Sequence, residues 1–347
     1  MWKWIWVLGL AGVILAGCAG APSPAGEMAA ATQEVTALPG EPQGDETGVA
    51  VTTQGSGTKN ETVTPQPLMT MRITSETPSA PPATATASPA PSLTPTVTPT
   101  LAPDFWMDLP VVPTVSERAR EIYRRGQQLG QKADAFAKVG DCEATTTWFL
   151  GMFDGPEGGY DLAQYVALQE TIDAFAGSWE RNSVAVKAGY TATSVMTALW
   201  ADPQQCESGE TPMACEYRLQ RPAFALIMLG SNNAARPERF EPQLRALLDE
   251  TIAQGIVPVL STKADNLEGD HSINAAIARL AVEYDIPLWN FWAAVQPLPR
   301  HGLDPDGAHL TLGPPDFDDP YAMKTAWTVR NLTALQVLDA VRRGVEE

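Results

Sequence analysis

The chain has 347 residues, with 41 acidic and 23 basic side chains and a formal net charge of −18. A chain this acidic repels phosphate backbones and anionic lipid surfaces, so we exclude nucleic acid as a partner. It contains four cysteines and three histidines without a C-x-x-C pair or a histidine cluster, so we expect no metal site and no cofactor.

The N-terminal segment is typical of an export signal. Lys3 precedes an apolar run over residues 5–15, which is shorter than the roughly 20 residues that a membrane-spanning helix needs. The ending Leu15-Ala-Gly-Cys18 resembles the bacterial lipoprotein signal, which implies that Cys18 becomes a lipid-carrying N-terminus. An ordinary signal peptide or an uncleaved anchor stays open as an alternative. We therefore predict a lipoprotein signal over residues 1–18 and a monomer tethered to the membrane on its extracytoplasmic side.

A linker and one folded domain make up the rest of the chain. Residues 19–103 are rich in Pro, Thr, Ala and Ser, and such a composition buries too little apolar surface to offset the entropy of ordering. We predict that this segment is a disordered spacer. Residues 104–347 are numerous enough for a single domain with a substantial core.

The remaining cysteines divide into a pair and one other. Cys206 and Cys215 flank a short loop with Gly and Pro, and in an oxidising exterior we expect them to form a local disulfide. This assignment leaves Cys142 unpaired.

Strands and helices alternate along the domain. A capping box at Thr114-Val-Ser-Glu117 predicts a helix that continues to residue 133. Apolar runs and helical periodicity predict the remaining elements, which are strands at 135–139, 183–188, 223–229, 256–260 and 286–289, and helices at 162–175, 240–254, 272–283 and 331–343. This alternation favours a parallel three-layer α/β sheet of the flavodoxin-like kind.

Four candidate residues follow predicted strands. Cys142, Gly189, Asn232 and the loop of His309 all come after such runs, and ligands of parallel α/β sheets bind beyond the carboxyl ends of the strands. In the same loop Asp306 precedes His309 by three residues, a spacing at which a carboxylate can hold an imidazole as a general base. A surface loop holding an unrelated Asp and His is the alternative.

The polar loop 263–271 ends just before the helix predicted at 272. We expect it to be a solvated loop or the N-cap of that helix. Contact between this loop and a substrate is the alternative.

Four ordered blocks resemble the SGNH (GDSL-type) hydrolases over about residues 135–345. They are Gly140-Asp-Cys142, Gly189-Tyr-Thr, Gly230-Ser-Asn-Asn233 and Asp306-Gly-Ala-His309. The resemblance implies that Gly189 and Asn232 are oxyanion donors, that His309 is the base and that Asp306 orients it.

The chain departs from the family at the nucleophile, where Cys142 replaces a serine. A thiolate can attack an ester carbonyl, so we predict a hydrolase of ester or acetyl groups on small esters or surface glycans, with Cys142 as its nucleophile. Two alternatives remain open. The domain binds a carbohydrate or acylated ligand without turnover, or Cys142 is an inert buried residue.

Overall fold

The computed structural model describes residues 102–156 and 159–347. The predicted signal over residues 1–18 and the predicted linker up to residue 101 lie outside the described residues. Among the helices of the described part, none is both long and apolar enough to cross a bilayer.

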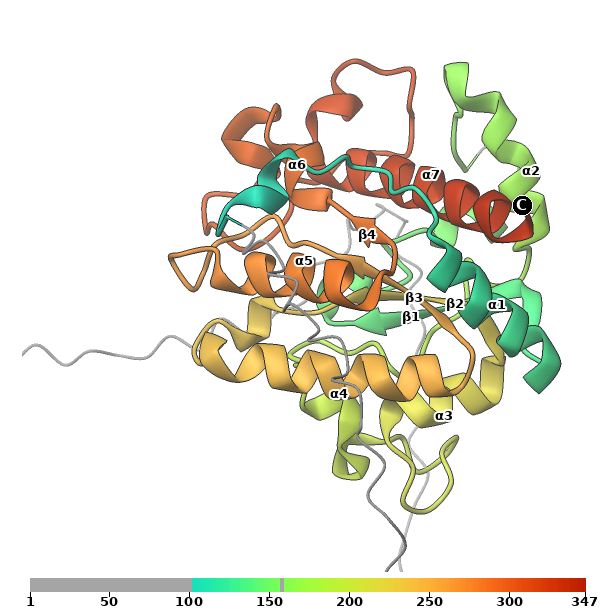
Figure 1. Ribbon diagram of the computed structural model, residues 1–347. Coiled ribbons are helices and arrows are strands. Elements are labelled where there is room, and N and C mark those ends of the chain that lie inside the picture. The colour runs from blue at the N-terminus through green and yellow to red at the C-terminus, as the bar shows by residue number, and fades with distance from the viewer. Residues whose placement is uncertain (1–101, 157–158) are drawn as a thin grey trace, which may run out of the picture. The chain divides into compact units, whose positions relative to one another are not determined.

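A four-stranded parallel sheet forms the centre of the domain. Its strands lie in the order in which they occur along the chain (Figure 1). They are β1 (Lys132–Gly140), β2 (Pro222–Met228), β3 (Val257–Ser261) and β4 (Leu288–Trp289). The prediction of a parallel α/β sheet is therefore confirmed.

The strand predicted at 183–188 is wrong. This segment meets the free edge of β1 through a single bridge between Gly140 and Val186. The hydroxyl of Ser183 donates to the carbonyl of Lys138 at 2.6 Å and so takes an acceptor that a continuous ladder would use. The segment nevertheless lies beside β1, on the side away from β2, where a flavodoxin-like order places its second strand.

Helices cover the sheet on two sides. They are α1 (Glu117–Leu129), α2 (Gln169–Ala174), α3 (Pro212–Gln220), α4 (Phe240–Ala253), α5 (Ser272–Tyr284), α6 (Phe291–Val295) and α7 (Ala326–Glu346). Helices α4 and α5 pack against each other and against β3, whereas α7 contacts α1, α2 and α6. Figure 1 shows α7 above the sheet and α4 below it.

Helix α1 is shorter than predicted at both ends. Its N-cap is Ser116, whose hydroxyl accepts from the N–H of Ala119 at 3.1 Å, so the capping residue is two positions later than Thr114. The helix ends at Gly130, which has φ 82° and closes the last turn in the left-handed conformation that glycine favours. Strand β1 can therefore begin at Lys132.

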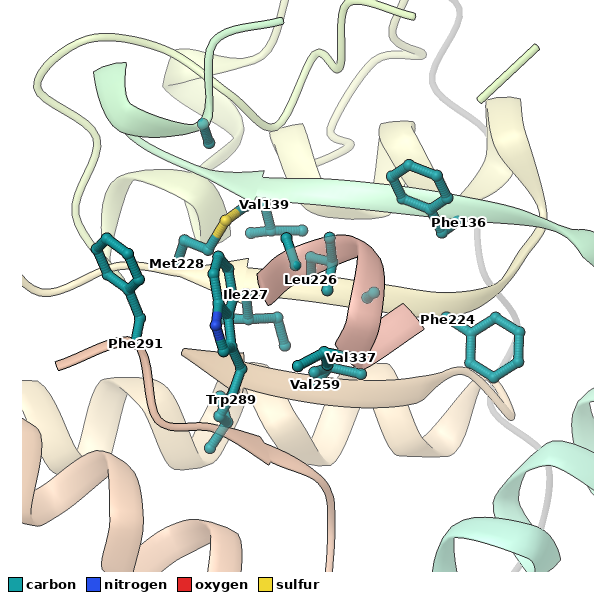
Figure 2. Close-up of a cluster of buried hydrophobic side chains, with 14 of the residues drawn as sticks. Phe136, Val139, Phe224, Leu226, Ile227, Met228, Val259, Trp289, Phe291 and Val337 are labelled. Atoms are coloured by element: carbon teal, nitrogen blue, oxygen red, sulfur yellow. The ribbon is translucent and has the colours of Figure 1, made fainter. Parts of the chain in front are cut away.

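The core lies on both faces of β2. Every residue of this strand is buried, because helices cover both faces of a parallel sheet and the strand is correspondingly a continuous apolar run. Figure 2 shows side chains of this cluster, among them Phe136, Leu226, Val259, Trp289 and Val337. This packing fixes the carboxyl ends of β1 and β2, from which two of the blocks extend.

Candidate functional site

Two glycines allow the first and third blocks to approach each other. A β-carbon on Gly140, the last residue of β1, would lie 2.8 Å from the carbonyl oxygen of Met228, the last residue of β2. Gly230 has φ 143°, and a β-carbon there would lie 2.8 Å from the side chain of Ile273. Larger residues would force the two strand ends and α5 apart.

The side chain of Asn232 joins three of the blocks. Its Nδ2 atom donates to Oδ2 of Asp141 at 3.1 Å and to the carbonyl oxygen of Tyr190 at 3.2 Å. Asp141 belongs to the first block, Tyr190 to the second and Asn232 to the third. The structure thus brings these blocks together, and both N–H groups of the amide are in use within the protein.

Asp141 is a buried carboxyl group that organises the turn after β1. Its Oδ1 atom accepts from the N–H of Glu143 at 3.1 Å, and its other oxygen accepts from Asn232. Burial is the largest influence on this group and raises its pKa to about 6. Asp141 therefore has a positioning role, holding the Asn232 amide against the first block.

Gly189 lies in an exposed turn beside this junction. It has φ 81°, and a β-carbon there would meet no atom within 4 Å. Within the described part of the chain its N–H donates to no protein acceptor, so this group is available to a ligand. Its predicted part in an oxyanion hole, like that of Asn232, stays a prediction.

Cys142 differs from the expectation that it is unpaired. The residue begins a 3-10 turn, Cys142–Ala144, directly after Asp141, and it is disulfide-bonded. The expectation was wrong because residue spacing does not reveal a disulfide between cysteines that are far apart in the sequence.

The disulfide between Cys206 and Cys215 is present, as predicted, with the two Cα atoms 5.3 Å apart. Glu210 lies close enough to both sulfur atoms to share a metal ion with them. Because both sulfurs are bonded to each other, neither is a thiolate ligand.

His309 and Asp306 form a close pair in their loop. The Nδ1 atom of His309 and the Oδ2 atom of Asp306 lie 2.5 Å apart. The other carboxylate oxygen accepts from the N–H groups of Ala308 and His309 at 2.9 and 3.0 Å. These contacts, with the imidazole first, lower the pKa of Asp306 to about 2.

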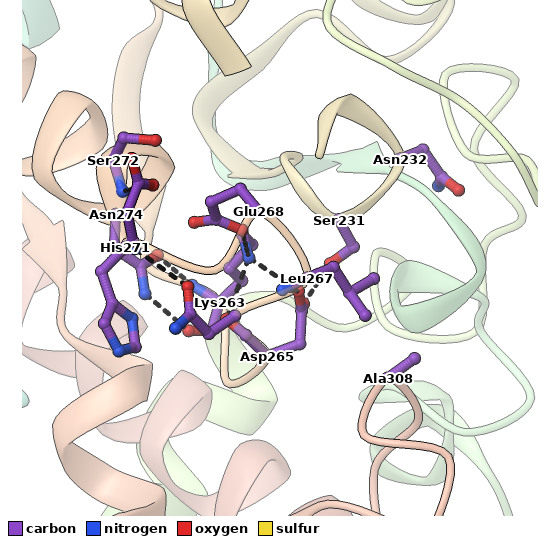
Figure 3. A network of polar contacts seen from close by, with 12 residues as sticks. Ser231, Asn232, Lys263, Asp265, Leu267, Glu268, His271, Ser272, Asn274 and Ala308 are labelled. Atoms are coloured by element: carbon purple, nitrogen blue, oxygen red, sulfur yellow. Dashed lines mark hydrogen bonds and ion pairs between the residues drawn. The ribbon is translucent and has the colours of Figure 1, made fainter. Parts of the chain in front are cut away.

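This pairing leaves the second ring nitrogen of His309 for other contacts. A carboxylate only accepts, so Nδ1 carries the proton and Nε2 is the free acceptor of the neutral ring. The loop is half exposed, with 40% of the His309 side chain accessible. Figure 3 shows Ala308, the neighbour of His309, across from Ser231 and Asn232. The roles of Cys142, His309 and Asp306 in catalysis stay predictions.

A buried carboxyl group directly after Cys142 was not among the predicted site residues. Glu143 is 13% exposed, and its Oε2 atom lies 3.9 Å from Nη1 of Arg330 on α7. Burial raises the pKa of Glu143 to about 8; the nearby Arg330 opposes this change, whereas Asp141 adds to it. At neutral pH this side chain is therefore mainly a neutral acid.

Arg330 is held in an aromatic cage. Its guanidinium carbon lies between 4.7 and 5.9 Å from four ring centroids, which are those of Phe149, Trp289, Phe291 and Trp327. Burial lowers its pKa from the ordinary value. The sequence indicated this group only through the position of Arg330 among apolar residues of α7. A charged residue in such a position is expected to be buried, and buried charged residues usually have a specific partner.

A second buried ionic group lies below the third block (Figure 3). The Nζ atom of Lys263 is 2.6 Å from carboxylate oxygens of both Asp265 and Glu268. Asp265 also accepts from the hydroxyl of Ser231 at 2.5 Å, and Asn274 bonds both the N–H and the carbonyl of Lys263. The prediction that loop 263–271 is a solvated loop is wrong for these side chains, since each is at most 5% exposed.

The predicted N-cap role of this loop is also only partly met. The residue before α5 is His271, which has φ 56° and makes no side-chain cap bond. Asp270 instead accepts from the N–H of Ser272 at 3.0 Å. The ionic group therefore fixes the loop from inside, while one carboxylate caps the helix from outside.

Comparisons with known proteins give matches only among solved structures. No protein-family model and no curated protein matches the chain. A GDSL-like lipase from Bacteroides thetaiotaomicron is 14% identical, with a TM-score of 0.36 over 64% of this chain and 97% of the lipase. The psychrotrophic esterase EstA from a Pseudoalteromonas species is 13% identical, with a TM-score of 0.38 over 62% of this chain and 100% of the esterase. A mutant of the esterase AlinE4 is 21% identical, with a TM-score of 0.32 over 51% of this chain and 86% of the esterase.

Proposed function

We propose that the chain is an SGNH-type hydrolase of ester or acetyl groups, exported and anchored to the membrane by lipid on Cys18. The observation that carries the proposal is the junction at Asn232, where one amide joins the first, second and third blocks. The close pair of His309 and Asp306 supplies the acid–base partner that such a site needs. The sequence of residues 1–18 supports the location.

The chemistry assigns a separate step to each group. His309 takes the proton of the Cys142 thiol, and the resulting thiolate attacks the ester carbonyl carbon. The carbonyl oxygen becomes an oxyanion near the N–H of Gly189 and the amide of Asn232. The carbonyl re-forms as the alcohol leaves with a proton from His309. Water, deprotonated by His309, then hydrolyses the thioester and restores the thiolate.

Two changes precede attack in this mechanism. Lipid on the sulfur of Cys18 leaves that sulfur unable to join a disulfide, so the disulfide of Cys142 belongs to the chain without lipid. An external thiol or phosphine first reduces it there, which leaves a thiol at position 142. The Asn232 amide must also turn one N–H from Asp141 or Tyr190 toward the oxyanion, since both are in use in the structure. Catalytic hydrogen bonds commonly form only in the complex with substrate.

The test measures hydrolysis of a small acetyl ester by the full chain, before and after treatment with a phosphine reductant that is then removed. Parent, Cys142→Ala, Cys142→Ser and His309→Ala are compared. We expect turnover only by the reduced parent, with both alanine variants silent. Equal turnover by the parent and Cys142→Ala would remove the thiol from the mechanism.

A binding protein without turnover is the second candidate, and the disulfide at Cys142 favours it. A sulfur held in a disulfide is no nucleophile, yet the junction at Asn232 remains intact around it. This candidate predicts that reduction of the disulfide produces no ester hydrolysis. It also predicts that a carbohydrate or acylated ligand binds equally well to the parent and to Cys142→Ala. Activity gained only by Cys142→Ser would indicate a hydrolase scaffold that has lost its nucleophile.

A further inference from the structure

A polar groove begins at Asn232 and runs along the start of α4. It has a volume of about 250 Å³, and its lining includes Thr191, Thr193, Asn232, Arg236, Arg239 and Gln243. Almost every lining side chain is a hydroxyl, amide or guanidinium group. The groove therefore presents several hydrogen-bond donors to a group that accepts hydrogen bonds.

Asn233 ties the two walls of this groove together. Its Oδ1 atom accepts from the N–H of Ala192 at 3.2 Å, and its Nδ2 atom donates to Oε1 of Gln243 at 3.2 Å. The side chain is 8% exposed. The carbonyl end of Gln243 is used by Asn233, whereas its amide N–H groups make no hydrogen bond within the described residues.

Arg236 and Arg239 place two positive charges at the groove. Both side chains are exposed. Arg239 lies 3.9 Å from Glu238, a weak contact, and within the described residues the guanidinium of Arg236 has no ion-pair partner. Most arginines elsewhere in the domain are paired with carboxylates, as Arg118, Arg245 and Arg342 are.

The charge of the whole chain gives this pair its significance. A net charge of −18 disfavours anions over most of the surface, whereas two adjacent guanidinium groups attract them locally. Guanidinium groups also bind carboxylate and phosphate oxygens through paired hydrogen bonds. The groove is thus a place where an anion can approach Asn232.

We propose that this groove binds an anionic oxygen group, a carboxylate or a phosphate, on the substrate of the site at Asn232. The inference rests on the proposed function in that the ester carbonyl lies at Asn232 while the anion lies toward Arg236 and Arg239. The substrate class is then a polar, anionic ester, rather than a neutral fatty ester. Acidic acetylated glycans and phosphorylated alcohols both satisfy this chemistry.

Three aryl acetates with related leaving groups test the proposal on the full, reduced chain. They are 4-acetoxybenzoate, 4-acetoxyphenyl phosphate and the neutral methyl 4-acetoxybenzoate. We expect kcat/KM for at least one anionic ester to exceed that of the neutral ester by roughly 10-fold, the size expected for two exposed ion pairs. A higher kcat/KM for 4-acetoxybenzoate would indicate that the groove binds a carboxylate. A higher kcat/KM for 4-acetoxyphenyl phosphate would indicate that it binds a phosphate.

The double variant Arg236→Gln/Arg239→Gln is expected to lose this preference. Its matched control is Arg118→Gln/Arg124→Gln on α1, which removes the same total charge from another exposed surface and should keep the preference. Equal kcat/KM for charged and neutral esters in the parent, or an equal loss in both double variants, would overturn the proposal.

A binding measurement separates failure of this proposal from failure of the hydrolase. The amide analogues 4-acetamidobenzoate and its methyl ester are titrated calorimetrically against the parent and both double variants. Preferential binding of the carboxylate that depends on Arg236 and Arg239 supports the groove even if no ester is hydrolysed. Ester hydrolysis without any such preference would support the proposed hydrolase activity and refute the proposal that the groove binds an anion.

Discussion

Replacing Glu143 by glutamine removes a buried acid without changing its shape. The folded protein raises the pKa of this carboxyl group from an ordinary 4.5 to about 8. Between pH 4.5 and about pH 8, Glu143 of the unfolded chain releases its proton, whereas Glu143 of the folded chain keeps it. The contribution of Glu143 to the free energy of unfolding is therefore most favourable below pH 4.5 and falls as pH rises toward 8.

The size of the effect follows from the interval between the two pKa values. Each pH unit is worth about 1.4 kcal/mol, so the ceiling for the full interval is about 5 kcal/mol. Asp141, whose pKa is raised to about 6, adds a similar loss in both proteins and largely cancels in their difference. We expect Glu143→Gln to gain on the order of 2–5 kcal/mol over the parent between pH 5 and pH 8.

Urea denaturation followed by tryptophan fluorescence at each pH measures this difference. Trp179 and Trp289 are both fully buried, so unfolding changes their emission. Glu121→Gln, which removes an exposed carboxylate on α1, is the control and should track the parent. Parallel pH profiles for the parent and Glu143→Gln would refute the reasoning, because they would mean that the folded protein does not hold the proton.

Three further predictions concern the disulfide, a close backbone contact and the acid–base pair. The double variant Cys206→Ala/Cys215→Ala should lose about 3 kcal/mol of stability in non-reducing urea denaturation, since the bridge spans a sequence separation of 9. Gly126→Ala should lower the unfolding free energy by roughly 1–3 kcal/mol, because the new β-carbon would lie 2.1 Å from the carbonyl oxygen of Gly255. Asp306→Asn should reduce kcat for a small ester by on the order of 1000-fold or more, because a neutral amide cannot stabilise the charged imidazole.

Each of these has a result that contradicts it. Equal urea midpoints with and without the bridge would show that it does not restrain the unfolded chain. An unchanged melting temperature for Gly126→Ala would mean that α1 and the turn before β3 move apart at no cost. Full turnover by Asp306→Asn, with an unaltered pH–rate profile, would show that the Asp306 carboxylate has no part in catalysis.

The sheet was largely predictable because its strands are apolar runs that helices cover on both faces. The runs at 223–229 and 256–260 lie within one residue of β2 and β3. The run at 183–188 also contains Ser183 and Lys187 and forms one bridge, since the Ser183 side chain takes a carbonyl of β1 that a ladder would use. Helix α3 escaped prediction because it is short and has little separation of apolar and polar faces.

Contacts of the site were predictable from the sequence where the two residues are close together in one short segment. The pair of Asp306 and His309 is local, and its spacing alone brings the two side chains together. The pairing of Glu143 with Arg330 joins residues far apart in the chain, and no periodicity connects them. No spacing in the sequence indicates the disulfide of Cys142 either.

Helix α7 has a consequence for the order in which the protein is completed during synthesis. It supplies Arg330 to Glu143, and the side chain of Asn331 bonds the N–H of Leu150 at 2.8 Å and the carbonyl of Trp148 at 3.1 Å. The segment after β1 is therefore made early but is held at both ends by α7, which is made much later. A nascent chain can pair its strands before α7 is made, yet its first block gains these contacts only once α7 is available.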